Sequence, residues 1–166
     1  MVISSSCRDA VAAAYERNAD ALFRIALAQL QNSEDAQDAV HDAFSRFIKS
    51  APSFDSTDQE RAWLIRVTVN VCHDLQRKRR HRTHLSLDDA LEVADSDTTW
   101  QSDERNAIMS AISALPEKYR IAVVLHYLED LPIDRAAHAA GISESAMKMR
   151  LLRAREMMQK TIGREM

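Results

Sequence analysis

The chain has 166 residues, of which 46% are hydrophobic and 28% charged, so its length suits one globular domain or two small ones. Only 2 glycines and 3 prolines accompany 25 alanines, a composition that disfavours a β-sandwich or barrel and favours long helices. Two glycines cannot build the glycine-rich loops that hold nucleotide phosphates. Two cysteines cannot build a disulfide framework or a four-cysteine zinc site.

The net charge of −3 conceals an uneven distribution along the chain. Residues 61–84 carry seven basic and one acidic side chain, and residues 141–164 carry six basic and two acidic. By contrast, residues 1–60 carry five basic and ten acidic side chains, and residues 85–110 carry one basic and seven acidic. This pattern predicts two local phosphate-binding regions and acidic surfaces that meet another partner, with solvated helix faces as the alternative.

The first 50 residues predict two helices. Residues 8–30 place apolar side chains on one helical face. The pattern breaks before Ser33, which we expect to cap a second helix that ends before Pro52. Apolar residues of this second helix follow the i, i+3, i+4 rule. Its opposite face carries Asp35, Asp38, Asp42 and Lys49.

Residues 60–80 alternate apolar and polar side chains in part, as a strand would, but we predict a helix. The segment continues without a turn signal, and the chain offers no second strand-like segment to pair with it. On a helix, one polar and basic stripe forms at spacings of four, three, four and three. It consists of Arg66, Asn70, His73, Arg77 and Arg80. An apolar stripe lies beside it, formed by Leu64, Val67, Val71 and Leu75.

Residues 81–102 are acidic and rich in serine, threonine and aspartate, which predicts a linker. Helical periodicity resumes near Asp103. Pro116 is expected at the first position of a following helix. The inner face of that helix is predicted to contain Ile121, Val124, Leu125 and Leu128.

The last 35 residues predict a helix-turn-helix. Pro132 begins a short helix over residues 133–139, Gly141 makes a tight turn, and Ser143 caps a last helix that runs to about Lys160. The last helix turns Met147, Leu151, Ala154 and Met158 inward. In this motif the start of the second helix enters the DNA major groove, although a helical hairpin with a purely structural role has a similar pattern.

Three sequence motifs, taken together and in order, resemble those of one family. They are SEDAQDAVHDAFSRF at residues 33–47, RAWLIRVTVNVCHDLQRKRR at residues 61–80 after Phe54, and AISALPEKYRIAVVLHYLEDLP followed by GISESAMKMRLLRAR over residues 111–155. The chain is similar to the extracytoplasmic-function (ECF) sigma factors of bacterial RNA polymerase. The resemblance implies an all-α protein with two small helical domains, 1–82 and 104–166, joined by an acidic linker over 83–103.

The resemblance also implies a role for each motif. The core-polymerase-binding face is expected at Asp35, Asp38, His41 and Asp42. Recognition of the minus-ten promoter element is expected at Phe54, Asp55, Arg66, Asn70, Arg77, Lys78, Arg79 and Arg80. The loop 54–58 with Asn70 would hold a flipped base, and the cations would bind the DNA backbone. Recognition of the minus-thirty-five element is expected at Lys148, Met149, Arg150, Leu152 and Arg153.

The expected partners are core RNA polymerase, double- and single-stranded promoter DNA, and an anti-sigma factor, with no cofactor and no catalytic activity. The start of the chain lacks the apolar core of a signal peptide, and its longest strongly apolar run, residues 121–125, is too short to cross a bilayer. We therefore expect a cytoplasmic chain without direct membrane insertion.

Some residues depart from the family pattern. His41 stands where glutamine is usual, and Ala146 and Met147 stand where threonine and valine are usual. Met149 and Leu152 can contact a thymine methyl group but offer no hydrogen-bond code. We therefore expect an unusual upstream promoter element, or weak dependence on it.

Several alternatives remain open at this stage. Three other classes of protein are compatible with the sequence: a sigma-like protein that titrates an anti-sigma factor, a helix-turn-helix repressor, and a helical metalloenzyme. The alternative role for Phe54 is to anchor the loop in the core. Trp63 is expected to pack in the core. The metal ligands would come from Cys72, His73, His81 and His84, but paired ligand spacings are missing.

Overall fold

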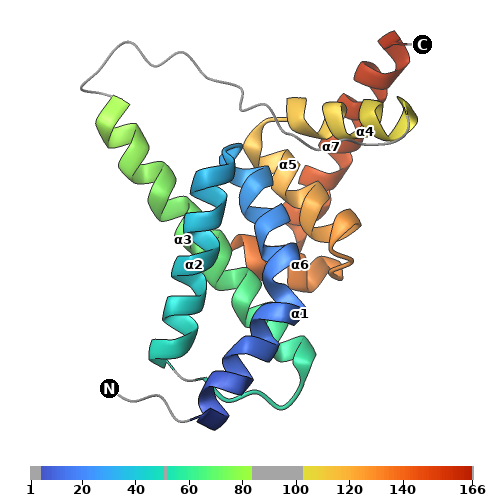
Figure 1. Ribbon diagram of the computed structural model, residues 1–166. Coiled ribbons are helices and arrows are strands. Elements are labelled where there is room, and N and C mark those ends of the chain that lie inside the picture. Colours follow the sequence, from blue (N-terminus) through green and yellow to red (C-terminus); the bar gives the residue numbers. More distant parts are fainter. Residues whose placement is uncertain (1–4, 51, 84–102, 166) are drawn as a thin grey trace. The chain divides into compact units, whose positions relative to one another are not determined.

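The computed structural model describes residues 5–50, 52–83 and 103–165 (Figure 1). All regular secondary structure in these ranges is helical, which confirms the all-α prediction. The chain divides into two compact units, Met1–Val93 and Ala94–Met166. The predicted linker lies almost wholly outside the described residues, since α3 ends at Thr83 and α4 begins at Asp103.

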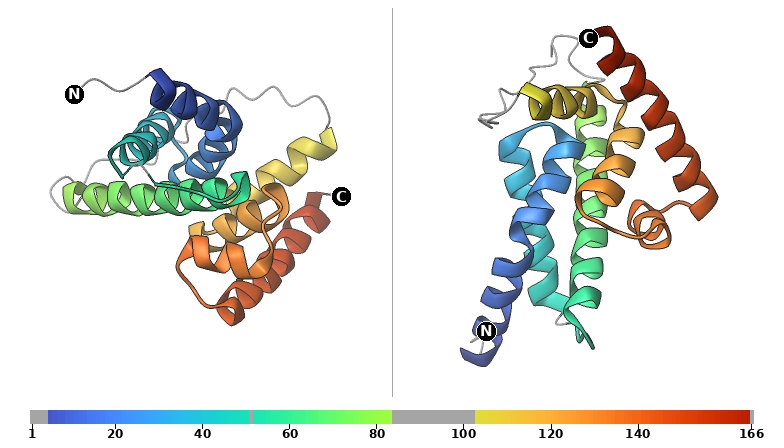
Figure 2. Two further views of the ribbon diagram at one scale, coloured as in Figure 1. Left: turned by 90° about the horizontal axis from the view of Figure 1, so that it is seen from below. Right: turned by 90° about the vertical axis from the view of Figure 1, so that its right-hand side faces the viewer.

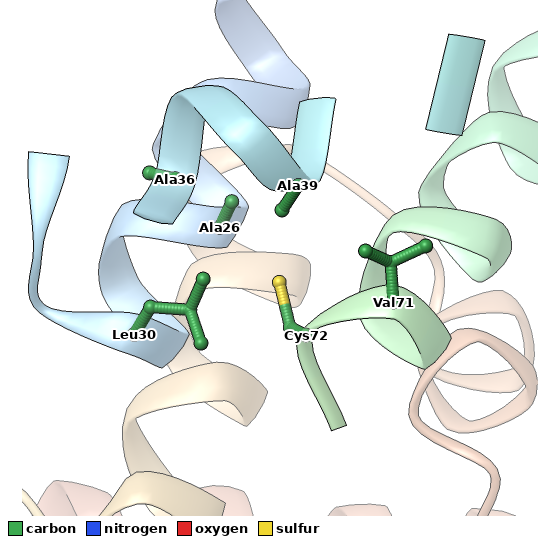
Figure 3. Close-up of a cluster of buried hydrophobic side chains, with 6 residues drawn as sticks. All are labelled: Ala26, Leu30, Ala36, Ala39, Val71 and Cys72. Carbon is green, nitrogen blue, oxygen red and sulfur yellow. The ribbon is translucent and has the colours of Figure 1, made fainter. Parts of the chain in front are cut away.

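The first unit is a bundle of three helices, α1 (Ser5–Leu30), α2 (Ser33–Ser50) and α3 (Thr57–Thr83), and each packs against the other two. Figure 2 shows the three helices side by side. Small side chains such as Ala26 and Ala39 let the helices approach closely, and Val71 and Cys72 of α3 pack against them. In Figure 3 the Cys72 sulfur lies among the side chains of all three helices.

The start of α2 differs from the prediction by one residue. Asn32 caps this helix, because its side-chain Oδ1 accepts a hydrogen bond from the backbone N–H of Asp35 at 3.0 Å. Its backbone carbonyl accepts the N–H of Ala36 at 2.9 Å. The expectation that Ser33 is the cap was therefore wrong. Gln31 has a left-handed backbone (φ 52°) and turns the chain just before this cap.

The second unit contains α4 (Asp103–Ala114), α5 (Glu117–Val123), η1 (Val124–Leu128), α6 (Ile133–Ala140) and α7 (Glu144–Glu165). Helix α7 packs against α4, α5 and α6. Pro116 and Pro132 are N-caps with φ near −55° rather than first helical residues. The helix after Pro116 therefore begins one residue later than predicted.

The predicted helix-turn-helix is present as α6, a turn and α7. Gly141 has φ 73°, a left-handed conformation that glycine adopts without steric cost. The N–H of Ile142 donates to the carbonyl of Ala137 at 3.0 Å, as at many helix ends that close on such a glycine. Ser143 caps α7 as predicted, since its Oγ accepts the N–H of Ala146 at 3.1 Å.

The segment η1 is a π-helical turn that the sequence pattern did not predict. The N–H of Glu129 donates to the carbonyl of Val124 at 2.9 Å, five residues back instead of four. The wider turn rotates the following side chains. Leu128, predicted to face inward, is 42% exposed, whereas Glu129 is buried. The predicted inner positions Val124 and Leu125 are buried as expected.

Candidate functional site

The acidic face of α2 is exposed at three of its four predicted residues. Asp38, His41 and Asp42 face solvent, because the apolar positions of this helix point into the bundle. Asp35 is only partly exposed and forms an ion pair with Arg79 of α3. The structure therefore separates Asp35 from the other three and links it to a residue predicted to bind DNA.

A second group of ion pairs joins α2 to α3. Arg46 of α2 lies 3.5 Å from Asp42 and 3.6 Å from Asp74 of α3, measured between guanidinium nitrogen and carboxylate oxygen. Arg77 reaches Asp74 at 3.9 Å. These side chains are 43% or more exposed, so each pair contributes little to stability. They do set the positions of charges on the surface that α2 and α3 share.

The basic end of α3 faces solvent. Arg77, Lys78, Arg79 and Arg80 are all exposed, and Asn70 is exposed on the same helix. Arg66 is partly buried. This helix therefore presents four of its five predicted phosphate-binding cations in one run near its C-terminus, and only Arg66 lies apart from them.

The predicted base-binding loop lies at the other end of α3, and its backbone is held by the first turn of that helix. The Oγ of Ser56 accepts the N–H of Gln59 at 3.2 Å. The Oε1 of Gln59 accepts the N–H of Asp55 at 3.0 Å. This reciprocal arrangement resembles a capping box. It leaves the Asp55 side chain exposed in the loop.

Phe54 anchors the loop in an aromatic cluster. Its ring centroid lies 6.2 Å from Phe47, nearly parallel, and 6.0 Å from Trp63, tilted by 60°. Phe47 and Trp63 are themselves 5.9 Å apart in an edge-on arrangement. Phe54 is partly buried, which favours the anchoring alternative for its ring, and Trp63 packs as expected.

The predicted recognition helix α7 turns a mixed surface outward. Lys148, Met149, Leu152 and Arg153 are exposed, and Arg150 is partly exposed. Two of these side chains are apolar, Met149 at 51% and Leu152 at 50% exposure. Their inward neighbours Met147, Leu151 and Ala154 are buried as predicted, and Met158 is partly buried.

Two tyrosines in contact with arginines of α7 were missed in the sequence analysis. Arg155 donates a hydrogen bond to the Tyr127 hydroxyl, and its guanidinium carbon lies 5.7 Å from the ring centroid. A hydrogen bond with Arg153 lowers the pKa of Tyr119, with burial acting in the opposite direction and Lys118 adding a smaller lowering effect. No periodicity could reveal these pairs, because 28 residues or more separate their members along the chain.

A buried arginine of α5 bonds to the segment between α4 and α5. Arg120 is 7% exposed and donates a hydrogen bond to the carbonyl of Leu115 at 2.8 Å. Burial lowers the pKa of Arg120, and the charge of Glu117 opposes this change. Its position assigns Arg120 to the architecture of the second unit instead of a surface that binds DNA.

The metal-binding alternative gains no support. Within the described ranges, no three histidine, cysteine or acidic residues lie close enough to hold a metal ion. His84 lies outside these ranges, and Cys72 is enclosed by the apolar core. The described helices also include none that is long and apolar enough to cross a membrane.

Comparison with known proteins identifies both units. Residues 14–82 match the family model of sigma-70 region 2, and residues 105–158 match that of sigma-70 region 4. The ECF RNA polymerase sigma factor SigM of Mycobacterium tuberculosis is 32% identical over 149 residues, which cover 90% of this chain and 75% of SigM. The two matches define the class as RNA polymerase sigma factors.

Two solved structures have a similar fold. The sigma factor RpoE of Bartonella quintana, solved with the anti-sigma factor NepR, superposes with a TM-score of 0.74 at 22% identity, over 87% of this chain and 91% of RpoE. CnrH, solved with the cytosolic domain of CnrY, superposes with a TM-score of 0.66 at 25% identity, over 96% of this chain and 91% of CnrH. The chain belongs to the ECF sigma factors. It thus acts with core RNA polymerase and promoter DNA in transcription initiation.

Proposed function

We propose that this sigma factor divides promoter recognition between its two units, with region 2 binding the minus-ten element and region 4 the minus-thirty-five element. The observation that carries this proposal is the arrangement of α3, which has the loop 54–58 at its N-terminal end and exposed cations at its C-terminal end. Between Asp58 and Arg80 the helix extends about 33 Å, or close to one turn of B-DNA.

This arrangement suits a protein that holds duplex DNA with one end of a helix and an unpaired base with the other. Arg77, Lys78 and Arg80 bind backbone phosphates, which positions the DNA without recognising its sequence. The exposed Asp55 and its neighbours accept a flipped base, whose loss of stacking and pairing costs a few kcal/mol. Phe54 keeps the loop in place through its ring contacts with Phe47 and Trp63.

Helix α7 supplies the upstream contact. Lys148, Arg150 and Arg153 provide charge for phosphates or guanine, and Met149 and Leu152 provide apolar contact with thymine methyl groups. An exposed face with so few hydrogen-bonding side chains supports a weak or unusual upstream preference. Arg153 also interacts with the Tyr119 side chain of α5.

The acidic face of α2 is the proposed docking surface for core polymerase. Asp38 and Asp42 supply negative charge on an exposed helix, and this charge complements a basic partner surface. His41 lies between them in sequence and shares their exposure. Asp35 is partly buried and paired with Arg79, so we assign it no direct contact with core polymerase.

We further propose an anti-sigma factor as a partner, the cytoplasm as the place of action, and a regulatory role without catalysis of its own. RpoE of Bartonella quintana, which shares the fold, was solved in complex with an anti-sigma factor. Sigma factors are regulatory subunits that act with RNA polymerase, and this supports both the location and the absence of catalysis.

The test is run-off transcription on fragmented genomic DNA with core polymerase, with and without this chain, followed by mapping of transcript starts. We expect new starts that share a minus-ten motif. The variant Asp55→Ala should alter base preference within that motif. Absence of new starts, while another sigma factor works in parallel, would contradict the proposal and favour a protein that titrates an anti-sigma factor.

A further inference from the structure

A polar network joins the middle of α1 to the first turn of α3. The Nη2 of Arg17 donates to both carboxylate oxygens of Glu60, at 2.9 and 3.0 Å. The Nε of Arg17 lies 3.3 Å from Glu60 Oε1. The Nδ2 of Asn18 donates to the same Oε1 at 3.0 Å. Glu60 therefore accepts hydrogen bonds from two adjacent residues of another helix.

The network combines an exposed half with a buried half. The Arg17 side chain is 45% exposed, so its ion pair is screened by water, whereas the Glu60 side chain is only 12% exposed. Asn18 is 3% exposed, and its Nδ2 also donates to the carbonyl of Ala14 at 2.9 Å. Because α1 holds this amide in place, the buried bond fixes where the Glu60 carboxylate lies.

From Glu60, a series of short contacts leads to the loop 54–58. The backbone N–H of Glu60 donates to the carbonyl of Ser56 at 3.2 Å. Ser56 in turn caps Gln59, and Gln59 accepts the N–H of Asp55. The position of the Asp55 backbone therefore depends on the first turn of α3, and that turn depends on its attachment to α1.

We propose that Glu60, held by Arg17 and Asn18, is a positioning residue for recognition of the minus-ten element. This inference rests on the proposed function of the loop 54–58. Glu60 holds the first turn of α3 against α1, so that the loop has its base-accepting geometry before DNA arrives. A loop that is free to shift by about 1 Å discriminates bases poorly, because hydrogen-bonded recognition depends on alignment.

The experiment measures base preference with the whole holoenzyme. Core polymerase with the full chain transcribes a library of one mapped promoter in which each minus-ten base is varied. Asp55→Ala first identifies the positions that the loop recognises. At those positions we expect Glu60→Gln and Asn18→Ala each to lower the ratio of preferred to disfavoured base by about tenfold. The ratio at the other positions and the affinity for core polymerase should not change.

Two controls separate positioning from stability, and a third variant serves as a substitute for Glu60→Gln. Glu16→Gln makes the same chemical change at an exposed site on α1 and should leave every ratio unchanged. Val71→Ala weakens the apolar core of the same unit, away from the loop, and should lower activity evenly across the library. Arg17→Met breaks the exposed half of the network. If Glu60→Gln does not fold, Arg17→Met takes its place in the assay.

The outcomes are distinguishable. Selective loss at the loop-recognised positions supports the positioning role. An even loss across all positions, matching Val71→Ala, overturns it and makes the network a stabilising contact only. If Asp55→Ala changes no position, the proposed function of the loop fails and the inference fails with it. If Asp55→Ala acts and Glu60→Gln does not, the inference alone is overturned.

Discussion

The two units prepare their proposed DNA-binding surfaces in different ways. In region 2 the loop 54–58 is bonded to α3, and α3 is bonded to α1 and α2 through Glu60 and Arg79. In region 4 the proposed DNA-binding face of α7 carries Met149 and Leu152 half-exposed. On the proposed function, this difference means that region 2 selects bases through a preset geometry, whereas region 4 contributes mainly charge and apolar contact.

The largest expected effect comes from the cations of α3. Replacing Arg77, Lys78 and Arg80 by alanine removes three proposed phosphate contacts from region 2. We expect the slope of log affinity against log salt concentration for the holoenzyme to become shallower by about 3. Binding to a mapped promoter at several salt concentrations measures this slope. Arg8→Ala with Lys49→Ala removes two exposed cations from other helices as the control, and a slope shallower by about 2 in that control would contradict the assignment.

Reversing charge on α2 should have the next largest effect, on assembly and not on DNA. Asp38→Lys with Asp42→Lys places like charges against a basic docking surface, so we expect core affinity to fall by at least about tenfold. The loss should shrink at high salt, because exposed charges are screened. A fluorescence titration of core polymerase measures it. Glu16→Lys with Asp20→Lys reverses two exposed acidic side chains on α1 instead, and this variant should bind normally.

Stability provides a third comparison of the units. Cys72→Ser places a hydroxyl in the apolar core of region 2, and we expect this to lower the free energy of unfolding by about 1–3 kcal/mol. Gly141→Ala forces a side chain into a left-handed turn of region 4, at a cost of about 1–2 kcal/mol. Denaturant unfolding, followed by amide exchange in each unit, measures both. If a substitution lowered amide protection only in the unit that does not contain it, the placement of Cys72 in the core of region 2 or of Gly141 in the turn of region 4 would be wrong.

The smallest expected effect concerns the upstream element. Met149→Ala and Leu152→Ala remove apolar contacts without removing charge, so we expect transcription from the mapped promoter to change only a few-fold. The change should depend on thymines in the upstream element. Substituting those thymines with uracil, which lacks the methyl group, should abolish the difference between the wild type and the variants. A large loss on both templates would mean that α7 carries more of the recognition than we propose.

Much of the fold followed from the sequence. Residues 33–50 had a regular apolar spacing, so α2 was predicted with nearly correct ends, and the Gly141 turn with the Ser143 cap located the helix-turn-helix. The errors were local. Asn32 and Ser33 are both good caps by residue type, so the sequence did not distinguish them, and in the structure Asn32 caps the helix directly after the left-handed Gln31. Leu128 was misplaced because a π-helical turn breaks the period on which the prediction rested.

The candidate site was predictable only where its residues share one helix. The acidic face of α2 and the basic run of α3 are periodic or contiguous, so their members could be named in advance. The contacts of Glu60 with Arg17 and Asn18 span 42 or 43 residues and follow no period. The Asp35–Arg79 and Tyr127–Arg155 pairs were missed for the same reason.

The sequence by itself determined the helices, the two basic regions and the motifs that assign the chain to the ECF sigma factors. These features depend on neighbours along the chain, through caps, prolines and apolar periodicity. Only the tertiary structure decided which charges face solvent and which meet each other, because packing brings distant helices together. It turned Asp35 toward α3, seated Phe54 among aromatic rings, and placed Glu60 where it can hold the loop.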